Sequence, residues 1–238
     1  MTEARVVVEG AMKRYGAVQA VDGVSLSIQA GEVYSLIGAN GAGKSTLIRM
    51  IVGITEPDAG RIMICGEDLA HRLPKTKQHL GYLPEELILY GRLTGREYLE
   101  LVAGLKESDR AVADEIDFFE LSQVSQKLVG AYSLGMRKKL GLAAAMIGSP
   151  DILVLDEPLN GLDVEMMRKL RLRIESERER GRALLISSHV MSFVERVSDR
   201  VGVMRGGRLV VEGSPTELRS STGLLDEPFE DVFFQLTG

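Results

Sequence analysis

Short runs of β-branched and aliphatic residues recur toward both ends of the chain, separated by polar or glycine-rich segments. Runs of this length and composition predict β-strands, and the glycine and acidic residues that bound them are typical of turns. The pattern predicts an α/β fold. Eight strands are expected, at residues 5–9, 24–28, 33–37, 61–65, 152–155, 183–187, 201–204 and 208–212.

The middle of the chain, residues 86–147, has a different pattern, with apolar residues three and four positions apart as on one face of a helix. We interpret this segment as a helical subdomain inserted into an α/β core that comprises residues 1–85 and 148–214. Helices are expected within it at residues 96–105, 111–121 and 136–147.

Two further helices are expected after the insertion. The charged segment 168–180 carries an apolar stripe, which favours a solvated amphipathic helix over a binding site. The last segment, 215–238, is predicted to be a helical tail that docks through four apolar residues at helical spacing, Phe229, Val232, Phe233 and Leu236.

Composition narrows the class of protein. The chain has 238 residues, enough for one large core with an inserted subdomain, and its net charge of -5 argues against nucleic acid as the main partner. A single cysteine, Cys65, allows no internal disulfide, and the first ten residues lack a secretory signal pattern, so a cytoplasmic location is expected. No apolar stretch approaches the roughly 18 residues of a membrane span, so another chain would have to cross any membrane that this protein serves.

A glycine-rich loop follows the strand predicted at residues 33–37. Residues 38–45 match the pattern GxxxxGK[ST] between a strand and a helix. Glycines let backbone N–H groups approach a phosphate closely, and the N-terminus of the following helix adds positive potential. Lys44 is expected to reach the β- and γ-phosphates, and the Ser45 hydroxyl to bind Mg²⁺.

Polar residues also end two other predicted strands. Asp156 and Glu157 follow the strand at 152–155, and His189 comes shortly after the strand at 183–187. Ligands of open α/β sheets bind beyond the carboxyl ends of the strands. We therefore expect Asp156 to hold Mg²⁺ and Glu157 to address a water aimed at the γ-phosphate, while a histidine here is by itself more often structural.

These motifs together resemble the nucleotide-binding subunits of ABC transporters over essentially the whole chain. "GANGAGKST" is similar to Walker A, "ILVLDEP" to Walker B, "NGLD" to the D-loop, "SSHV" to the switch histidine and "YSLGM" to the signature. The resemblance implies a P-loop NTPase (RecA-like) core with an antiparallel β subdomain and an inserted α-helical subdomain, binding and hydrolysing ATP with Mg²⁺. It assigns the phosphate loop to Gly38, Ala39, Asn40, Gly41, Ala42, Gly43, Lys44, Ser45 and Thr46.

The resemblance also implies roles for single residues. Tyr15 would stack on adenine, although on its own it is an ordinary surface or core tyrosine. Glu157 would be the general base, Lys44 and His189 would contact the γ-phosphate, and Asp163 would couple the two sites of a dimer.

In this family two subunits pack head to tail, so that each ATP lies between the phosphate loop of one and the signature of the other. Ser133 and Gly135 would then bind the γ-phosphate across the interface. Two positions depart from the family pattern around the signature, Leu134 and Met136, and a weaker closed dimer is expected. Glu85 stands where a glutamine usually contacts Mg²⁺; its carboxylate is expected to ligate the ion in the same way, although it adds negative charge near the γ-phosphate.

The function expected is an ATPase subunit on the cytoplasmic face of the cell membrane, driving a separate membrane-spanning transporter together with a second, identical ATPase subunit. The signature, "YLPEE" and the chain's last residues are most similar to ABC-2 type exporters. Residues 87–90 either suit docking of the membrane subunit or pack inside the helical arm. Two alternatives are a soluble ABC-type ATPase of translation or DNA maintenance, and a weakly hydrolytic regulatory subunit.

Overall fold

The computed structural model describes residues 3–107 and 112–237, and each of the eight expected strands overlaps a strand in it. Most are longer than the apolar runs that predicted them, because backbone pairing continues into polar residues. The strands are β1 (Ala4–Tyr15), β2 (Val18–Gln29), β3 (Val33–Gly38), β4 (Ala59–Ile64), β7 (Ile152–Asp156), β8 (Ala183–Ser187), β9 (Arg200–Arg205) and β10 (Arg208–Gly213).

The helices follow the predicted pattern in the middle of the chain and add several that it did not predict. The expected segments correspond to α3, α4, α5, α6 and α9, although the first residue expected in the second helix, residue 111, lies outside the described residues. The α-helices are α1 (Lys44–Ile51), α2 (Leu69–Thr76), α3 (Gly95–Leu105), α4 (Val112–Phe118), α5 (Leu134–Met146), α6 (Val164–Glu179), α7 (Met191–Val197), α8 (Pro215–Thr222) and α9 (Phe229–Thr237), with 3-10 turns η1 (Lys77–His79) and η2 (Val129–Ala131).

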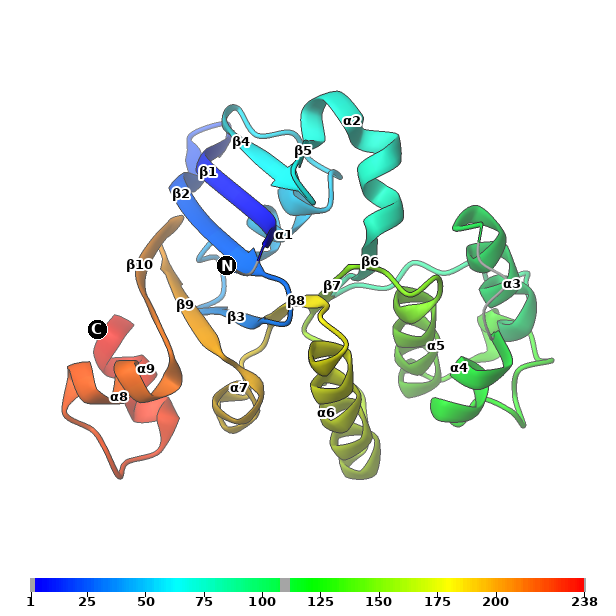
Figure 1. The fold of residues 1–238 in the computed structure, drawn as a ribbon. Coiled ribbons are helices and arrows are strands. Elements are labelled where there is room, and N and C mark those ends of the chain that lie inside the picture. The colour runs from blue at the N-terminus through cyan, green and yellow to red at the C-terminus, as the bar shows by residue number, and fades with distance from the viewer. Residues whose placement is uncertain (1–2, 108–111, 238) are drawn as a thin grey trace.

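The strands form two sheets (Figure 1). One has four antiparallel strands in the order β2-β1-β4-β5, and the other has six in the order β10-β9-β3-β8-β7-β6. In the second sheet all neighbouring strands are parallel except β9 and β10. The carboxyl ends of β3, β7 and β8 therefore meet at one edge, as the sequence predicts for the phosphate loop and the acid pair.

Two strands were not predicted, β5 (Glu67–Asp68) and β6 (Leu80–Leu83). β5 has only two residues, and β6 carries a glycine in its four. A Cβ on that glycine, Gly81, would lie 2.0 Å from the carbonyl oxygen of Ala145 in α5. The glycine therefore lets this edge strand pack directly against the helix.

Apolar cores lie on both faces of the six-stranded sheet. On one face, α1 packs between the two sheets through buried side chains such as Leu47 and Ile48. On the other face, Leu170 and Ile174 of α6 belong to a core that continues into the helical segment, where Phe119 is fully buried. Figure 1 shows the antiparallel sheet above the six-stranded one, with α6 on its far side and α3, α4 and α5 beside it. None of the helices that the structure describes is apolar over enough length to cross a bilayer.

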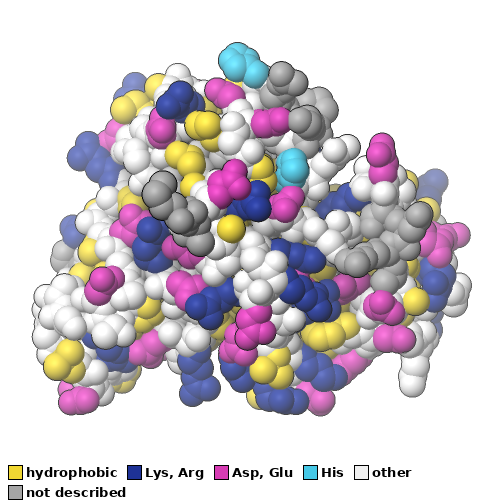
Figure 2. All heavy atoms as spheres, in the orientation of Figure 1, with side chains coloured by type: hydrophobic (Ala, Val, Ile, Leu, Met, Phe, Trp, Pro, Cys, Tyr) yellow, Lys and Arg dark blue, Asp and Glu magenta, His cyan; other side chains and the backbone are white. Residues whose placement is uncertain are grey.

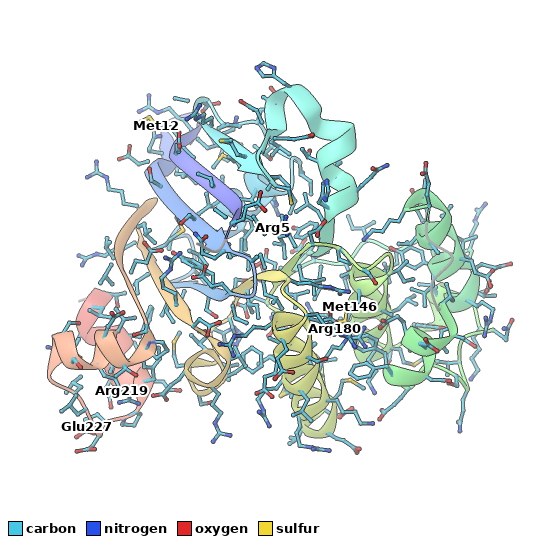
Figure 3. All side chains as sticks on the ribbon, in the orientation of Figure 1. Arg5, Met12, Met146, Arg180, Arg219 and Glu227 are labelled. Carbon is cyan, nitrogen blue, oxygen red and sulfur yellow. The ribbon has the colours of Figure 1, made fainter. Side chains whose placement is uncertain are left out.

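The tail helix is confirmed. Phe229 and Val232 are buried against α7 and β9, and Phe233 and Leu236 are partly buried beside them. Arg219 of α8 holds the connection between α8 and α9, where Figure 3 labels it beside Glu227. Its guanidinium donates to Glu195 of α7 at 2.5 Å and to backbone carbonyls that include that of Glu227.

The charged segment 168–180 departs from a purely solvated helix at Glu177, which has no exposed surface. Arg173 and Arg180 donate to this carboxylate at 2.6 and 3.0 Å, and Arg182 pairs with its other oxygen. Basic side chains gather on the same face, between α5 and α6 (Figure 2), where Figure 3 labels Arg180. A buried charge of this kind is tolerated because it is paired.

Replacing Glu177 by alanine should destabilise the fold by about 3–5 kcal/mol, because the change leaves arginines in a partly buried site without their counter-charge. Urea unfolding at equilibrium measures the loss. The control is Glu175→Ala, which removes a pair with Arg171 at the same helical spacing but on a side chain that is 38% exposed. That change should cost under about 1 kcal/mol, and equal losses from the two variants would contradict the argument.

Candidate nucleotide-binding site

The loop between β3 and α1 is shaped by close backbone contacts. Gly43, the residue before α1, has φ +104, and a Cβ there would lie 2.2 Å from the carbonyl oxygen of Ala20 in β2. A Cβ on Gly38 would lie 2.4 Å from the carbonyl oxygen of Met204 in β9. Side chains are therefore excluded at both ends of the loop, and its N–H groups together with the N-terminus of α1 form an anion-binding surface.

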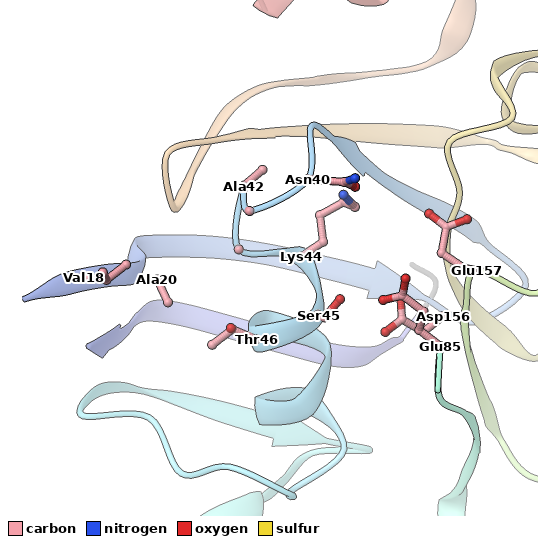
Figure 4. A pocket seen from close by; sticks show the side chains of 12 residues that line it. Val18, Ala20, Asn40, Ala42, Lys44, Ser45, Thr46, Glu85, Asp156 and Glu157 are labelled. Atoms are coloured by element: carbon pink, nitrogen blue, oxygen red, sulfur yellow. The ribbon is translucent and has the colours of Figure 1, made fainter. Parts of the chain in front are cut away.

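A cleft of about 450 Å³ opens at this loop. Lys44 lies at its mouth and donates from Nζ to the carbonyl oxygens of Gly38 at 2.7 Å and Ala39 at 3.3 Å. Figure 4 shows Lys44 and Asn40 facing three carboxylates across the cleft. Its lining residues are Val18, Ala20, Asn40, Gly41, Ala42, Gly43, Lys44, Ser45, Thr46, Glu85, Asp156 and Glu157.

The acid pair is fixed from the neighbouring strand. Asp156, at the end of β7, is paired in register with Ser187, at the end of β8. The Ser187 hydroxyl donates to Asp156 Oδ1 at 2.5 Å and accepts from the backbone N–H of Glu157 at 2.9 Å. Glu157 has φ 47, an uncommon conformation for a residue other than glycine, and this turn directs its side chain toward the cleft.

The three carboxylates crowd one another. Burial raises the pKa of Asp156, and the charges of Glu85 and Glu157 act in the same direction, while the Ser187 hydrogen bond and Lys44 oppose them. The Ser45 hydroxyl faces the same cleft as the carboxylates of Asp156 and Glu85. This set of oxygen donors with excess negative charge is the kind that hard divalent cations such as Mg²⁺ prefer.

His189 lies against the second acid of the pair. Its Nδ1 atom is 2.8 Å from Glu157 Oε2, and its side chain is largely exposed. An imidazole in this position can orient the glutamate carboxylate and present its other ring nitrogen to a ligand in the cleft. The structure therefore brings together the phosphate loop, Glu85, both acids and the histidine that the sequence singled out.

Ser133, Gly135 and Asp163 line a separate cleft of about 480 Å³. Ser133 accepts from the Met136 N–H at 3.2 Å and so caps α5, and Asp163 accepts from the Met166 N–H at 2.8 Å and caps α6. Both residues therefore stand at helix N-termini, where the helix dipole favours an anion. A Cβ on Gly135 would lie 2.8 Å from the carbonyl oxygen of Gly161, so the signature and the D-loop touch within one chain.

Tyr15 does not line the first cleft. It ends β1, the residue is 50% exposed, and the ammonium of Lys13 lies 5.8 Å from its ring centroid. Val18 and Ala20, just after it, line the cleft instead. The stacking of Tyr15 on adenine stays a prediction.

At the signature, Leu134 is mostly exposed and Met136 packs against the core.

Sequence reasoning missed two residues of the site. Ser187 connects both acids, and a polar residue at the end of a buried strand was the available signal. Lys138 of α5 is buried, and its Nζ has no hydrogen-bond partner among the described residues. Burial lowers the pKa of Lys138, whereas the charges of Asp156, Glu157 and Glu85 raise it. Lys138 is one of three consecutive basic residues, and the sequence does not show which of the three faces the interior.

Comparison with known proteins agrees with this arrangement. Residues 21–160 match the ABC transporter family. Nod factor export ATP-binding protein I of Burkholderia orbicola is 40% identical over 88% of this chain and 70% of its own length. Daunorubicin resistance ATP-binding protein DrrA3 of Streptomyces coeruleorubidus is 36% identical over 94% of this chain and 72% of its own.

Solved structures are similar over the whole fold. A structure described as an ATP binding subunit of an ABC transporter has a TM-score of 0.93 and 30% identity, covering 98% of this chain and 99% of that one. The dimeric cassette MJ0796 has a TM-score of 0.80 over 88% of this chain and 98% of its own, at 21% identity, and supports the fold alone.

The predicted P-loop NTPase fold is thus confirmed. These relatives are named as transporter components and give no support to the alternatives in translation, DNA maintenance or regulation. The matching region contains the phosphate loop, Glu85, the signature and the acid pair. The chain belongs to the ABC transporter family, in which it is an ATP-binding and ATP-hydrolysing subunit.

Proposed function

We propose that this chain hydrolyses MgATP as one half of a head-to-tail dimer that drives a separate membrane-spanning exporter. The observation that carries the proposal is the separation of two half-sites on one chain. The phosphate loop and the acids line one cleft, whereas Ser133, Gly135 and Asp163 line another. A phosphate loop and a signature that lie apart in one chain can enclose the same nucleotide only when a second chain supplies one of them.

Each group at the first cleft has a part in the reaction. Lys44 and the N–H groups of the loop hold the β- and γ-phosphates, with Lys44 exchanging its backbone carbonyl partners for phosphate oxygens. Ser45, Asp156 and Glu85 would hold Mg²⁺, which when bound neutralises charge on the phosphates. The crowding of the carboxylates of Asp156 and Glu85 supports this assignment, because a divalent cation between them relieves their repulsion.

Glu157 is the general base for the attacking water. Its backbone is anchored by the Ser187 hydroxyl and its carboxylate contacts His189, so the oxygen that accepts the proton is held in a defined position. His189 positions the carboxylate of Glu157, and the exposed side of the imidazole ring is free to contact the γ-phosphate. Water attack then produces ADP and phosphate, and the proton passes to Glu157.

The second cleft completes the site of a partner chain. Two N-capped helices, α5 and α6, direct their N-termini toward it, so that a γ-phosphate held there gains backbone donors and a favourable dipole. ATP then joins the two chains, and loss of the γ-phosphate weakens the interface. This two-state contact converts hydrolysis into opening and closing of the dimer.

The exporter assignment has support from the surface and from the relatives. Ile88 is 94% exposed and Tyr90 is also exposed, while Leu87 and Leu89 pack partly against the core. The alternation leaves two apolar side chains free to dock a membrane subunit on the cytoplasmic face. The named relatives act in Nod factor export and daunorubicin resistance.

We also propose that the chain divides into a core of residues 1–85 and 148–214, a helical subdomain of residues 86–147 and a tail of residues 215–238.

Glu157→Gln should lower steady-state ATP turnover by roughly 10²-fold, because the amide cannot accept the proton while it preserves the side chain's shape. Release of inorganic phosphate measures the rate, and binding of a fluorescent ATP analogue should be unchanged. Glu230→Gln, an exposed acid of α9, serves as the control and should keep wild-type turnover. Wild-type turnover in Glu157→Gln would exclude this residue as the base.

Asp156→Asn should abolish hydrolysis but raise the melting temperature of the nucleotide-free chain at neutral pH. The pKa of Asp156 is raised in the fold, so its ionised form costs stability above that raised pKa. This cost in stability falls as the pH drops from the raised pKa of the folded chain toward the lower pKa of the unfolded chain. Below the unfolded-state pKa it vanishes. The difference in melting temperature should therefore disappear in acid and shrink when Mg²⁺ is added. A variant less stable than wild type at neutral pH would contradict the argument.

Ser133→Asp should prevent ATP-dependent dimerisation in a Glu157→Gln background, because a carboxylate would stand where the partner's γ-phosphate binds. Aspartate is a good helix N-cap, so α5 stays intact. Ser133→Asn, which caps equally well without the charge, is the matched control and should dimerise more readily. Size-exclusion chromatography with MgATP measures both variants, and equal dimer fractions would count against a shared nucleotide.

A further inference from the structure

Three side chains with metal-binding atoms meet where the two sheets join, away from the nucleotide cleft. Cys65 lies between β4 and β5, His79 ends η1, and Asp151 directly precedes β7. The cysteine sulfur, a ring nitrogen of the histidine and a carboxylate oxygen of the aspartate all lie within 4.8 Å of one another. His79 Nδ1 and Asp151 Oδ2 are 2.6 Å apart, and all three residues are partly buried.

The fold itself brings these residues together from distant parts of the chain. β6 and β7 are parallel, and Leu80 is paired in register with Ile152. The residues before these two, His79 and Asp151, therefore stand side by side at the amino ends of the strands. Cys65 reaches them because its N–H donates to the Arg5 carbonyl at 2.8 Å, which fixes the turn that follows β4.

We propose that Cys65, His79 and Asp151 bind one thiophilic divalent cation of the zinc class, with water as the fourth ligand. Thiolate, imidazole and carboxylate are the ligands that Zn²⁺ takes in proteins, at about 2.0–2.3 Å in a tetrahedral arrangement. The 2.6 Å between His79 Nδ1 and Asp151 Oδ2 is shorter than the spacing of two ligand atoms around one such ion. Small side-chain rotations would separate these two atoms enough to admit a central cation.

The charges around the cluster suit a dication. A thiolate and a carboxylate supply two negative charges, which equals the charge of the cation. Arg5 also lies beside Cys65, and its guanidinium is 3.7 Å from the carboxylate of Glu3, so its positive charge has a counter-charge of its own. Figure 3 shows Arg5 where the end of the antiparallel sheet meets the six-stranded one.

This site is separate from the proposed Mg²⁺ site in position and in chemistry. Asp151 and Asp156 lie at opposite ends of β7, one just before the strand and the other its last residue. The nucleotide cleft presents only oxygen donors from Ser45, Asp156 and Glu85 to Mg²⁺, whereas this cluster offers sulfur and nitrogen. A bound cation would tie the β4–β5 turn to β6 and β7, and so stabilise the contact between the two sheets.

Titration of the full-length chain with Co²⁺, without nucleotide or Mg²⁺, tests the proposal. Cys65 is the only cysteine of the chain, so any thiolate-to-cobalt charge-transfer band in the near ultraviolet must arise from it. We expect the band to saturate at one equivalent and to vanish when Zn²⁺ is added. We also expect Zn²⁺ to raise the melting temperature of the wild-type chain but not of Cys65→Ser.

Variants separate a built site from a thiol that binds metal on its own. His79→Ala and Asp151→Asn should each weaken Co²⁺ binding by at least about tenfold, whereas His71→Ala, an exposed histidine of α2, should leave it unchanged. Circular dichroism checks that each variant is folded, and Asp151→Asn keeps a side chain of nearly the same size. No band at stoichiometric Co²⁺ would overturn the proposal, and so would wild-type affinity in both His79→Ala and Asp151→Asn.

Discussion

The nucleotide site depends on backbone packed directly against backbone. The loop after β3 is held between Ala20 of β2 and Met204 of β9, with no room for a side chain at Gly38 or Gly43. The N–H of Gly207, between β9 and β10, also donates to the carbonyl oxygen of Ala42 in the loop at 3.0 Å. Both sheets therefore fix the shape of the loop, and β2 of the antiparallel sheet also supplies Val18 and Ala20 to the lining of the cleft.

The electrostatics of the cleft follow from that rigid shape. Asp156 and Glu157 are adjacent, and Glu85 faces them from the segment after β6, so negative charge accumulates where the strands end. The buried ammonium of Lys138 is carried by α5, in the helical segment. The charges of Asp156, Glu157 and Glu85 act on this amine, so we expect the position of α5 to respond when a ligand changes the charge of the cleft.

The order of motifs along the chain was enough to predict the fold and most of the cleft. Short runs of β-branched and aliphatic residues predicted β3, β7 and β8, and the edge where they end followed from parallel pairing. β6 was missed because its four residues include Gly81 and give no alternation, although its packing against α5 is close. α8 lies within the predicted helical tail, but it was not expected as a separate helix, although Ser214 and Glu217 form a capping box with Pro215 at the first helical position.

Side-chain partnerships were harder to predict, because they depend on register between segments distant in sequence. Ser187 meets Asp156 through strand pairing, and Glu177 collects its arginines partly from beyond its own helix. The cluster of Cys65, His79 and Asp151 likewise joins residues from three separate segments. A local pattern can mark a candidate residue, such as Ser187 at the end of a buried strand, but it does not show which residue that side chain meets.

The tight approach of Gly135 to the Gly161 carbonyl has a mechanical consequence. Gly161 lies four positions after Glu157, so one short stretch of chain runs from the proposed base in the first cleft to the lining of the second. In the proposed head-to-tail pair, each chain would thus connect two bound nucleotides. If hydrolysis moves the backbone beside Glu157, the close contact between Gly161 and Gly135 would carry that movement to the second cleft, and this is how we expect the two nucleotide sites of the pair to influence each other.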